Sequence, residues 1–203
     1  MPQPLQLAAS RPSAVSLRLA RVVTEISAPT VLVGILLLLQ PLLTPGVTWL
    51  QGVMAAVFTV GLPFAGILWL KQRGSVTDHH VGVRTQRAPI LAASAVSMGI
   101  GALVLILLDA PAAMFGEIGG VFIGMMLCLA ANLVWKLSVH SAVAAYVGLA
   151  LLAPIPAVGA GLALLLASAT GWSRVKIGDH TPTQVLAGHI AGCLAFATAL
   201  LLP

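Results

Sequence analysis

The chain has 203 residues, of which 59% are hydrophobic and only 7% are charged, whereas an ordinary soluble domain has about 45–50% apolar and about 25% charged residues. This composition, with a mean hydropathy of +1.05, excludes a water-soluble globule and a disordered or collagen-like chain, and indicates an integral membrane protein. The formal net charge of +5 comes with no basic and aromatic pattern, so we expect no nucleic-acid partner.

The first 26 residues form a basic, amphipathic N-terminal arm. If Ser13 caps a helix, its apolar residues gather on one face and Arg18, Arg21 and Glu25 on another. The apolar residues on that face are Val15, Leu19, Val22, Val23 and Ile26. The pattern predicts an interfacial helix and no cleavable signal, with a frayed basic tail as the alternative.

The rest of the chain, residues 27–203, is predicted to be a single membrane-embedded domain. A hydrocarbon core about 30 Å thick needs roughly 20 apolar residues at 1.5 Å per residue. Seven segments approach this length: residues 28–43, 49–70, 90–108, 118–135, 141–153, 157–172 and 185–202. The predicted fold is therefore all-α, a polytopic bundle of six to seven transmembrane helices after an N-terminal interfacial helix.

Two details of this bundle follow from small residues and prolines. Pro154 and Pro156 interrupt the fifth and sixth segments and predict a tight hairpin there, a re-entrant pair being the alternative. Gly188 and Gly192, four residues apart, predict close helix packing. The two cysteines, Cys128 and Cys193, lie in apolar runs and are interpreted as small buried hydrophobes.

Seven crossings alternate sides, and this places the charges asymmetrically. One face receives Asp109 and Glu117 and no basic residue. The other receives all ten, namely Arg11, Arg18, Arg21, Lys71, Arg73, Arg84, Arg87, Lys136, Arg174 and Lys176. By the positive-inside rule the basic face is predicted to be cytoplasmic, in a bacterial-type inner membrane or a plasma membrane.

Histidines gather on the basic face as well. His79, His80, His140 and His180 fall at three separate loops, and ionisable groups at this depth often mark a site. On a helix that continues from the fourth segment, Asn132, Lys136 and His140 share one stripe, because they are four residues apart. His189 is predicted to be a hydrogen-bonded packing histidine instead.

The clearest chemical pattern precedes the last apolar segment. Ser173 and Arg174 are followed after five residues by His180 and after three more by Gln184. An arginine beside a helix N-terminus is a ready anion site, and a nearby histidine can attack phosphorus. Acyl transfer and metal catalysis are less favoured, because no carboxylate stands behind a Ser and His pair and no ligand cluster supports a metal. We expect no metal and no cofactor.

These residues resemble the motifs of the type 2 phosphatidic acid phosphatase superfamily of membrane lipid phosphatases. The third motif is Ser173-Arg174-Val-Lys-Ile-Gly-Asp-His180-Thr-Pro-Thr-Gln184, the second is Leu137-Ser138-Val139-His140, and the first is represented by Arg84, Arg87 and Pro89. The resemblance covers about residues 71–202, and only the third motif is specific.

The resemblance implies residue roles. His180 is the expected nucleophile that forms a phosphohistidine, and His140 the acid that protonates the leaving alcohol. The implied phosphate ligands are Arg174, Arg87 and Ser138, with backbone N–H groups. His80 takes the position of the lysine of the first motif, so that phosphate contact is either missing or supplied by Arg84 or Lys136.

The second and third motifs also depart from the family pattern. Leu137 replaces a proline and Val139 a glycine. Gln184 replaces the acid that orients the nucleophile, and Asp179 or Asp78 is the alternative orienting group.

The function that the motifs indicate is a metal-independent lipid phosphatase acting on a phosphate monoester or diphosphate of a polyprenyl or phosphatidyl lipid. The alternatives are a catalytically silent relative that binds or moves a phosphorylated lipid, and a small transporter whose pathway is lined by Asn132, Lys136 and His189. Gln184 favours the silent relative, and the intact spacing from Ser173 to His180 favours the enzyme. The expected partners are a phosphorylated lipid and the bilayer.

Overall fold

The computed structural model describes residues 13–74 and 84–202. Helices make up 82% of these residues, and no strand occurs within them. The prediction of an all-α chain is therefore confirmed for the described part.

The N-terminal arm is a helix packed onto the bundle. α1 (Ala14–Ile26) begins at Ser13, whose side chain accepts a hydrogen bond from the Ser16 amide at 3.3 Å. Its buried side faces α8 (Gly159–Lys176), where Thr24 Oγ1 donates to Ser173 Oγ at 3.0 Å. Its apolar face points outward, with Val15 76% exposed. The predicted helix is confirmed, and it has a polar contact with the core that the sequence did not predict.

The next two passes contain a proline-linked irregularity. α2 (Pro29–Leu43) follows α1 after a bend of 42°. α3 (Trp49–Ala56), the π-helical turn η1 (Val57–Gly61) and α4 (Leu62–Gln72) form one continuous run. Pro63 has no N–H to donate to the preceding turn, and Ser97 Oγ instead donates to the Phe58 carbonyl at 2.6 Å. The π turn thus lies where Pro63 interrupts the hydrogen-bond ladder.

The remaining passes follow the predicted segments closely. They are α5 (Arg84–Leu107), α6 (Ala112–Val134), α7 (Val139–Val147) with the π-helical turn η2 (Gly148–Leu152), α8, and α9 (Pro182–Ala199). α7 with η2 and α8 form the predicted hairpin across Pro154 and Pro156. α6 begins six residues before the predicted start at residue 118, directly after the extended Pro111 at its N-cap position. Glu117 is accommodated inside the helix, where its Oε1 accepts from Tyr146 Oη at 2.7 Å.

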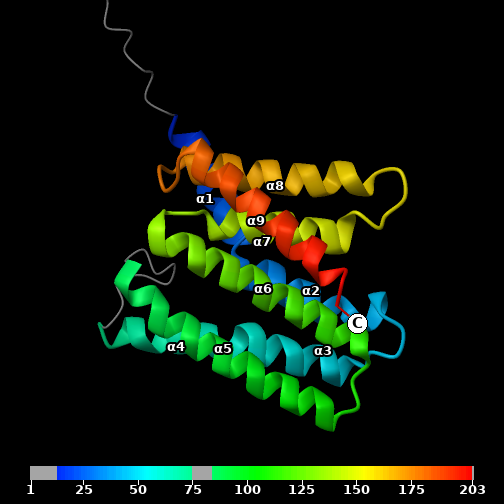
Figure 1. Ribbon diagram of the computed structural model, residues 1–203. Coiled ribbons are helices and arrows are strands. Elements are labelled where there is room, and N and C mark those ends of the chain that lie inside the picture. The colour runs from blue at the N-terminus through cyan, green and yellow to red at the C-terminus, as the bar shows by residue number, and fades with distance from the viewer. Residues whose placement is uncertain (1–12, 75–83, 203) are drawn as a thin grey trace, which may run out of the picture.

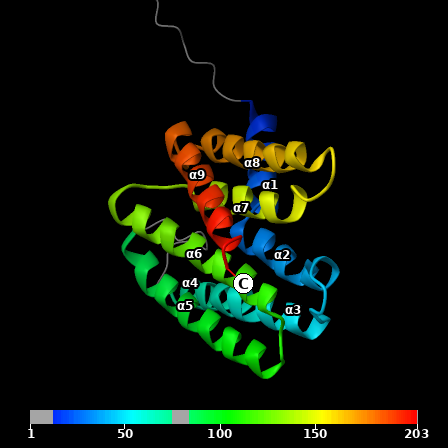
Figure 2. The same ribbon diagram turned by 45° about the vertical axis from the view of Figure 1, so that its right-hand side comes forward.

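Successive passes run antiparallel, so their ends collect at two opposite ends of the bundle (Figure 1). α1, α7, α8 and α9 pack on one side, α3, α4 and α5 on the other, and α2 and α6 lie between them, as the turned view also shows (Figure 2). Leu36 and Leu37 of α2 and Met114 of α6 are fully buried in this middle layer, and Leu105 of α5 is fully buried in the same apolar cluster.

Two helical runs, Trp49–Gln72 and Ala112–Val134, are long and apolar enough to cross a membrane, and the bent pair of α1 and α2 makes a third. The chain is thus compatible with a membrane protein. α8 and α9 have 18 residues each, which is about 27 Å of helix against a core of about 30 Å. These two lengths fall short of a full crossing.

The contact between α7 and α9 is a close approach of two backbones. A Cβ added at Gly188 would lie 2.4 Å from the Ser138 carbonyl oxygen, and one added at Gly192 would lie 2.1 Å from that of Ala142. Only glycine fits at these two places, so the predicted packing role of Gly188 and Gly192 is confirmed. Cys128 is buried as predicted, but Cys193 is exposed, because it lies on the outer side of α9.

Candidate functional site

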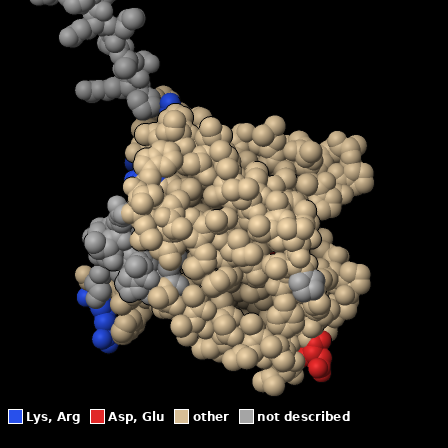
Figure 3. Space-filling model, in the orientation of Figure 1, with Lys and Arg blue, Asp and Glu red and all other residues tan. Residues whose placement is uncertain are grey.

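Basic residues gather at one end of the bundle. In Figure 3 lysine and arginine lie at the left edge and acidic residues at the lower right. The left end in Figure 1 brings together the end of α6, the start of α7, the end of α8 and the start of α9. The predicted second and third motifs therefore meet at the basic end.

The loop between α8 and α9 holds Arg174 and His180 in fixed relation. Gly178 adopts a φ of +83°, a left-handed conformation that favours glycine. The turn lets the amides of Asp179 and His180 both donate to the Arg174 carbonyl, at 3.1 and 3.3 Å. Thr181 then caps α9. The backbone of the third motif is closed into a compact loop.

Gln184 contacts His180 as the spacing predicts. Its Oε1 lies 3.2 Å from His180 Nδ1 and also accepts from the Thr181 amide at 3.1 Å. Because a backbone N–H can only donate, the shared atom is the amide oxygen, and it can only accept. His180 Nδ1 therefore carries the proton, and Nε2 keeps a lone pair.

The surroundings of His180 favour its neutral form. Burial first, and then the positive charges of Arg174 and Lys136, lower its pKa from the ordinary 6.5 to about 4. The hydrogen bond that His180 donates to Gln184 and the charge of Asp179 act in the opposite direction. The imidazole is thus uncharged at neutral pH.

Arg174 is a buried guanidinium with unused donors. It is 5% exposed, and its Nη2 forms an ion pair with Asp179 Oδ2 at 2.6 Å. Its Nε and Nη1 are buried and have no hydrogen-bond partner among the described residues. Leaving a charged donor unpaired costs more than leaving a neutral one unpaired, so these two groups fit an oxyanion.

The sequence left Asp179 open as an alternative group that orients His180, but in the structure Asp179 binds other partners. Its carboxylate pairs with Arg174, and its carbonyl accepts from Lys136 Nζ at 2.8 Å. The side chain that contacts the His180 ring is Gln184.

The predicted stripe of Asn132, Lys136 and His140 on one helix is wrong. α6 ends at Val134 because Trp135 is extended, with a φ of −147°, and α7 begins only at Val139. Asn132 is buried in α6, where it donates to the Cys128 carbonyl. The three residues reach the same end of the bundle on three different elements.

Ser138 connects the second motif to the third. Its hydroxyl caps α7 by accepting from the Ser141 amide at 3.4 Å and the Ser141 hydroxyl at 2.9 Å. Its own amide donates to the Gln184 carbonyl at 3.2 Å. A hydroxyl that accepts still has one proton to donate. His140, 6% exposed, lies in the first turn of α7 and is thereby held at the same end as Gln184.

α1 supplies two site residues that sequence reasoning missed. Thr24 donates to Ser173, whose hydroxyl in turn donates to the Thr170 carbonyl at 2.7 Å. Glu25 attracts the charge of Arg174 across the same contact. The sequence feature that could have drawn attention to Glu25 is that it is one of only five acidic residues in the chain.

The first motif is only partly described. α5 begins at Arg84, and its first turns, which include Arg87, start from the basic end (Figure 1). The side chains of Arg84 and Arg87 lie outside the described part, as do Asp78, His79 and His80.

His189 is a packing residue, as predicted. Its Nε2 lies 3.1 Å from the Ala167 carbonyl oxygen, which only accepts, so that nitrogen carries the proton. The ring also lies against Gly171, where an added Cβ would be 3.2 Å from its Cε1.

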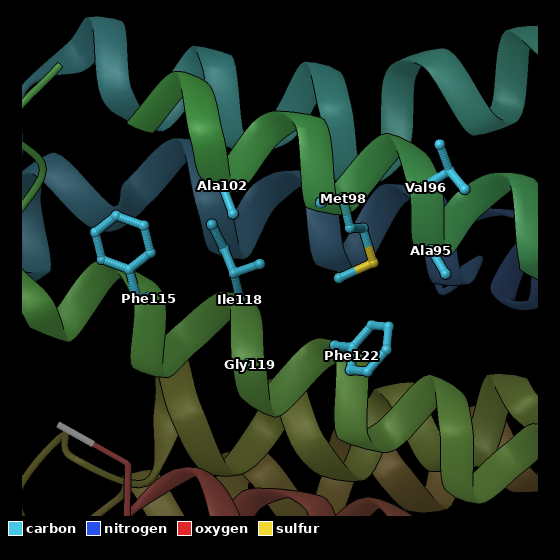
Figure 4. A pocket seen from close by; sticks show the side chains of 9 residues that line it. Ala95, Val96, Met98, Ala102, Phe115, Ile118, Gly119 and Phe122 are labelled. Atoms are coloured by element: carbon cyan, nitrogen blue, oxygen red, sulfur yellow. The ribbon is translucent and has the colours of Figure 1, made fainter. Parts of the chain in front are cut away.

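An apolar cavity of about 520 Å³ lies apart from these residues, between α5 and α6. Met98, Phe115, Ile118 and Phe122 project into it (Figure 4), and no titratable residue lines it. Its lining fits hydrocarbon and offers nothing to a phosphate.

Comparisons with protein families, with curated proteins and with solved structures find no match for this chain. Within residues 13–74 and 84–202, no three His, Cys, Asp or Glu side chains gather as metal ligands.

Proposed function

We propose that this chain is a polytopic membrane lipid phosphatase. It hydrolyses a phosphate monoester or a diphosphate of a polyprenyl or phosphatidyl lipid through a phosphohistidine. One observation carries the proposal. Arg174 is buried at the end of α8 with two donors that no described residue partners, and the loop that folds back onto its carbonyl carries His180, whose Nδ1 proton is held by Gln184. A fixed cation for an oxyanion and a free imidazole lone pair are the two parts that phosphoryl transfer to histidine requires.

In the first step His180 Nε2 attacks phosphorus, and the P–O bond to the lipid alcohol breaks. His140 donates a proton to the departing oxygen. In the second step water attacks the phosphohistidine, the P–N bond breaks, and His140 takes the proton from the water. Each half-reaction balances, because the same histidine gives and recovers one proton.

The oxygens of the transferred group are held by positive charge. Arg174 donates from Nε and Nη1, and the other proposed ligands are Lys136, Ser138, Arg84 and Arg87. A bound dianion offsets the cations that lower the His180 pKa, so the ring becomes more basic when substrate arrives. Preorganised donors at a partly dry site stabilise the charge of the transition state.

The proposed membrane arrangement has six to seven crossings, with α1 at the interface and the basic end cytoplasmic. Seven antiparallel helical passes in the described part support it. The site then lies at the membrane surface, where a lipid can present its phosphate while its chain stays in hydrocarbon.

A catalytically silent relative that binds a phosphorylated lipid is the second candidate. It is favoured by Gln184, which brings no charge to His180 and shares its oxygen with the Thr181 amide. A carboxylate there would stabilise the imidazolium character that develops during attack.

The deciding experiment measures inorganic phosphate released from a panel of lipid phosphates by the purified protein. We expect wild type to release phosphate in excess EDTA, and His180→Gln to release none. His189→Gln is the matched control, because that histidine packs against α8. Release by His180→Gln at the wild-type rate contradicts the proposal. Binding of the lipids without any release favours the silent relative.

A further inference from the structure

The outer face of α1 is an apolar stripe that the fold leaves exposed. At about 100° per residue, its four side chains fall within an arc of about 60°. They are 53% to 76% exposed, and they are Val15, Leu19, Val22 and Ile26. The buried residues of the helix, Ala20 and Thr24, lie on the opposite side. α1 therefore packs on the protein with one face and presents apolar side chains outward with the other.

One flank between these two faces of α1 is basic. Arg18 and Arg21 are exposed on it, and Glu25 lies beside them on the same flank. The opposite flank of α1, with Ser16 and Val23, has no charge. Two arginines against one glutamate leave the basic flank with a net positive charge.

The contacts of α1 place this flank at the basic end of the bundle. Thr24 donates to Ser173, and Glu25 attracts the charge of Arg174, so α1 lies beside the end of α8. In a bundle that spans the bilayer, this end lies at the level of the lipid headgroups. The apolar stripe then faces acyl chains, and the arginines, which keep their charge, lie among the phosphate groups of the lipids.

We propose that α1 is a docking surface for the anionic phospholipids of the surrounding bilayer. Arg18 and Arg21 bind the headgroups, while the stripe inserts among the acyl chains. One basic residue near an anionic membrane surface favours binding by about 5-fold, so two arginines with one glutamate give a net enrichment of anionic lipid of about 5-fold. A second copy of this chain on the stripe is disfavoured, because it would bring two net positive flanks together.

This role is separate from the proposed hydrolysis of phosphate esters. It gives α1 two partners, which are lipid on the outer face and the end of α8 on the inner face. Lipid that is bound outside therefore holds in place the helix whose inner face contacts Ser173.

Fluorescence quenching by lipids tests the proposal in the full chain, with Cys128 and Cys193 replaced by alanine. A fluorophore is attached to Leu19→Cys, and the protein is reconstituted into vesicles of phosphatidylcholine with a minority of phosphatidylglycerol. Bromine on the acyl chains of one lipid or the other acts as the quencher. Per brominated lipid present, phosphatidylglycerol is expected to quench about 5-fold more strongly than phosphatidylcholine. High salt is expected to lower this ratio, because it screens the charges.

Charge variants show whether the arginines cause the enrichment. Arg18→Gln combined with Arg21→Gln is expected to lower the ratio to one or below, and Arg18→Lys combined with Arg21→Lys is expected to keep it. Arg73→Gln is the matched control, because it removes a cation that lies over the Trp69 ring at the end of α4, and it is expected to leave the ratio unchanged.

Three results would overturn the proposal. One is equal quenching by the two lipids when both arginines are present. Another is a ratio that stays unchanged in the double glutamine variant or is lost in the double lysine variant. The third is quenching by neither lipid, which would mean that protein, such as a second copy of the chain, covers the stripe.

Discussion

His180 and Gln184 illustrate how one side chain sets the state of another. The glutamine oxygen accepts from the ring and from the Thr181 amide at once, so it selects the tautomer and cannot rotate away without uncapping α9. Gln184 thus orients the His180 ring but brings no negative charge to it. The site therefore has a prepared nucleophile nitrogen and only weak stabilisation of the ring after attack.

Replacement of Gln184 by glutamate separates these two contributions. Gln184→Glu keeps the acceptor and adds a charge, so we expect a higher pKa of His180 and faster phosphate release. The carboxylate at a helix N-terminus also adds about 0.3–1 kcal/mol of stability. Rates of phosphate release and NMR titration of the ring measure the two effects.

The control is Gln184→Met, of similar length but with no acceptor. It is expected to slow release by about 10²-fold or more, because the tautomer is no longer held. Equal rates in the Glu and Met variants would show that the partner of Nδ1 does not matter.

Lys136 controls the protonation of His180 through space. Burial, and then the charges of Arg174 and Lys136, lower the pKa of His180 to about 4. Lys136→Gln removes the smallest of these three causes, so we expect the acid limb of kcat/KM to move part of the way toward 6.5. Lys176→Gln serves as the control variant, and the acid limb of its kcat/KM profile is expected to stay at the wild-type position. A limb that does not move in Lys136→Gln contradicts the electrostatic account.

The same shift has a consequence for stability. Between pH 6.5 and about 4 the unfolded chain binds a proton at His180 that the folded chain does not. The contribution of His180 to the free energy of unfolding is therefore complete above pH 6.5, and it is lost as the pH is lowered through this window.

At the scale of elements, the contact between α7 and α9 decides whether the motifs meet. The helices touch through Gly188 and Gly192, and the amide of Ser138 reaches the Gln184 carbonyl beside that contact. Backbone contact at this point joins the N-terminal turns of α7 and α9, which carry His140 and Gln184.

Gly192→Ala tests this contact. The new methyl would lie 2.1 Å from the Ala142 carbonyl oxygen, so the helices must separate, at a cost of about 1–3 kcal/mol. Thermal unfolding in detergent and phosphate release should both fall. Gly161→Ala in α8 meets nothing within 4 Å and should gain about 0.5–1 kcal/mol from helix propensity. Equal unfolding midpoints for the two variants would refute the tight contact.

The whole molecule separates its charges along the direction of its helices. Described basic residues lie at the motif end, and the exposed Asp109 lies at the turn between α5 and α6 at the other end. If the bundle spans the bilayer, this separation orients it with the basic end in the cytoplasm.

Cysteine labelling tests that orientation, in a protein whose own Cys128 and Cys193 are replaced by alanine. An impermeant thiol reagent applied to intact cells is expected to label Pro156→Cys, at the end opposite to the motifs, and to spare Gln72→Cys at the basic end. Both should react once the membrane is opened. The reverse pattern in intact cells would place the site outside.

The sequence by itself determined the all-helical class, the apolar helices, the hairpin at Pro154 and Pro156, and the contact between His180 and Gln184. The first three depend on composition and on periodicity within one segment. The fourth depends on the capping box at the start of α9, in which Gln184 reaches back toward His180. The predicted continuation of α6 through Lys136 failed because the extended Trp135 and the cap at Ser138 override the periodic pattern.

Only the tertiary structure decided which groups surround Arg174. Thr24 and Ser173 are 149 residues apart, and no local pattern relates α1 to α8. The pairing of Arg174 with Asp179, the charge of Glu25 nearby and the two guanidinium donors without a partner in the described part of the chain likewise follow from packing. The physical reason is that the energy of a buried charge depends on everything around it, and those neighbours come from helices far apart along the chain.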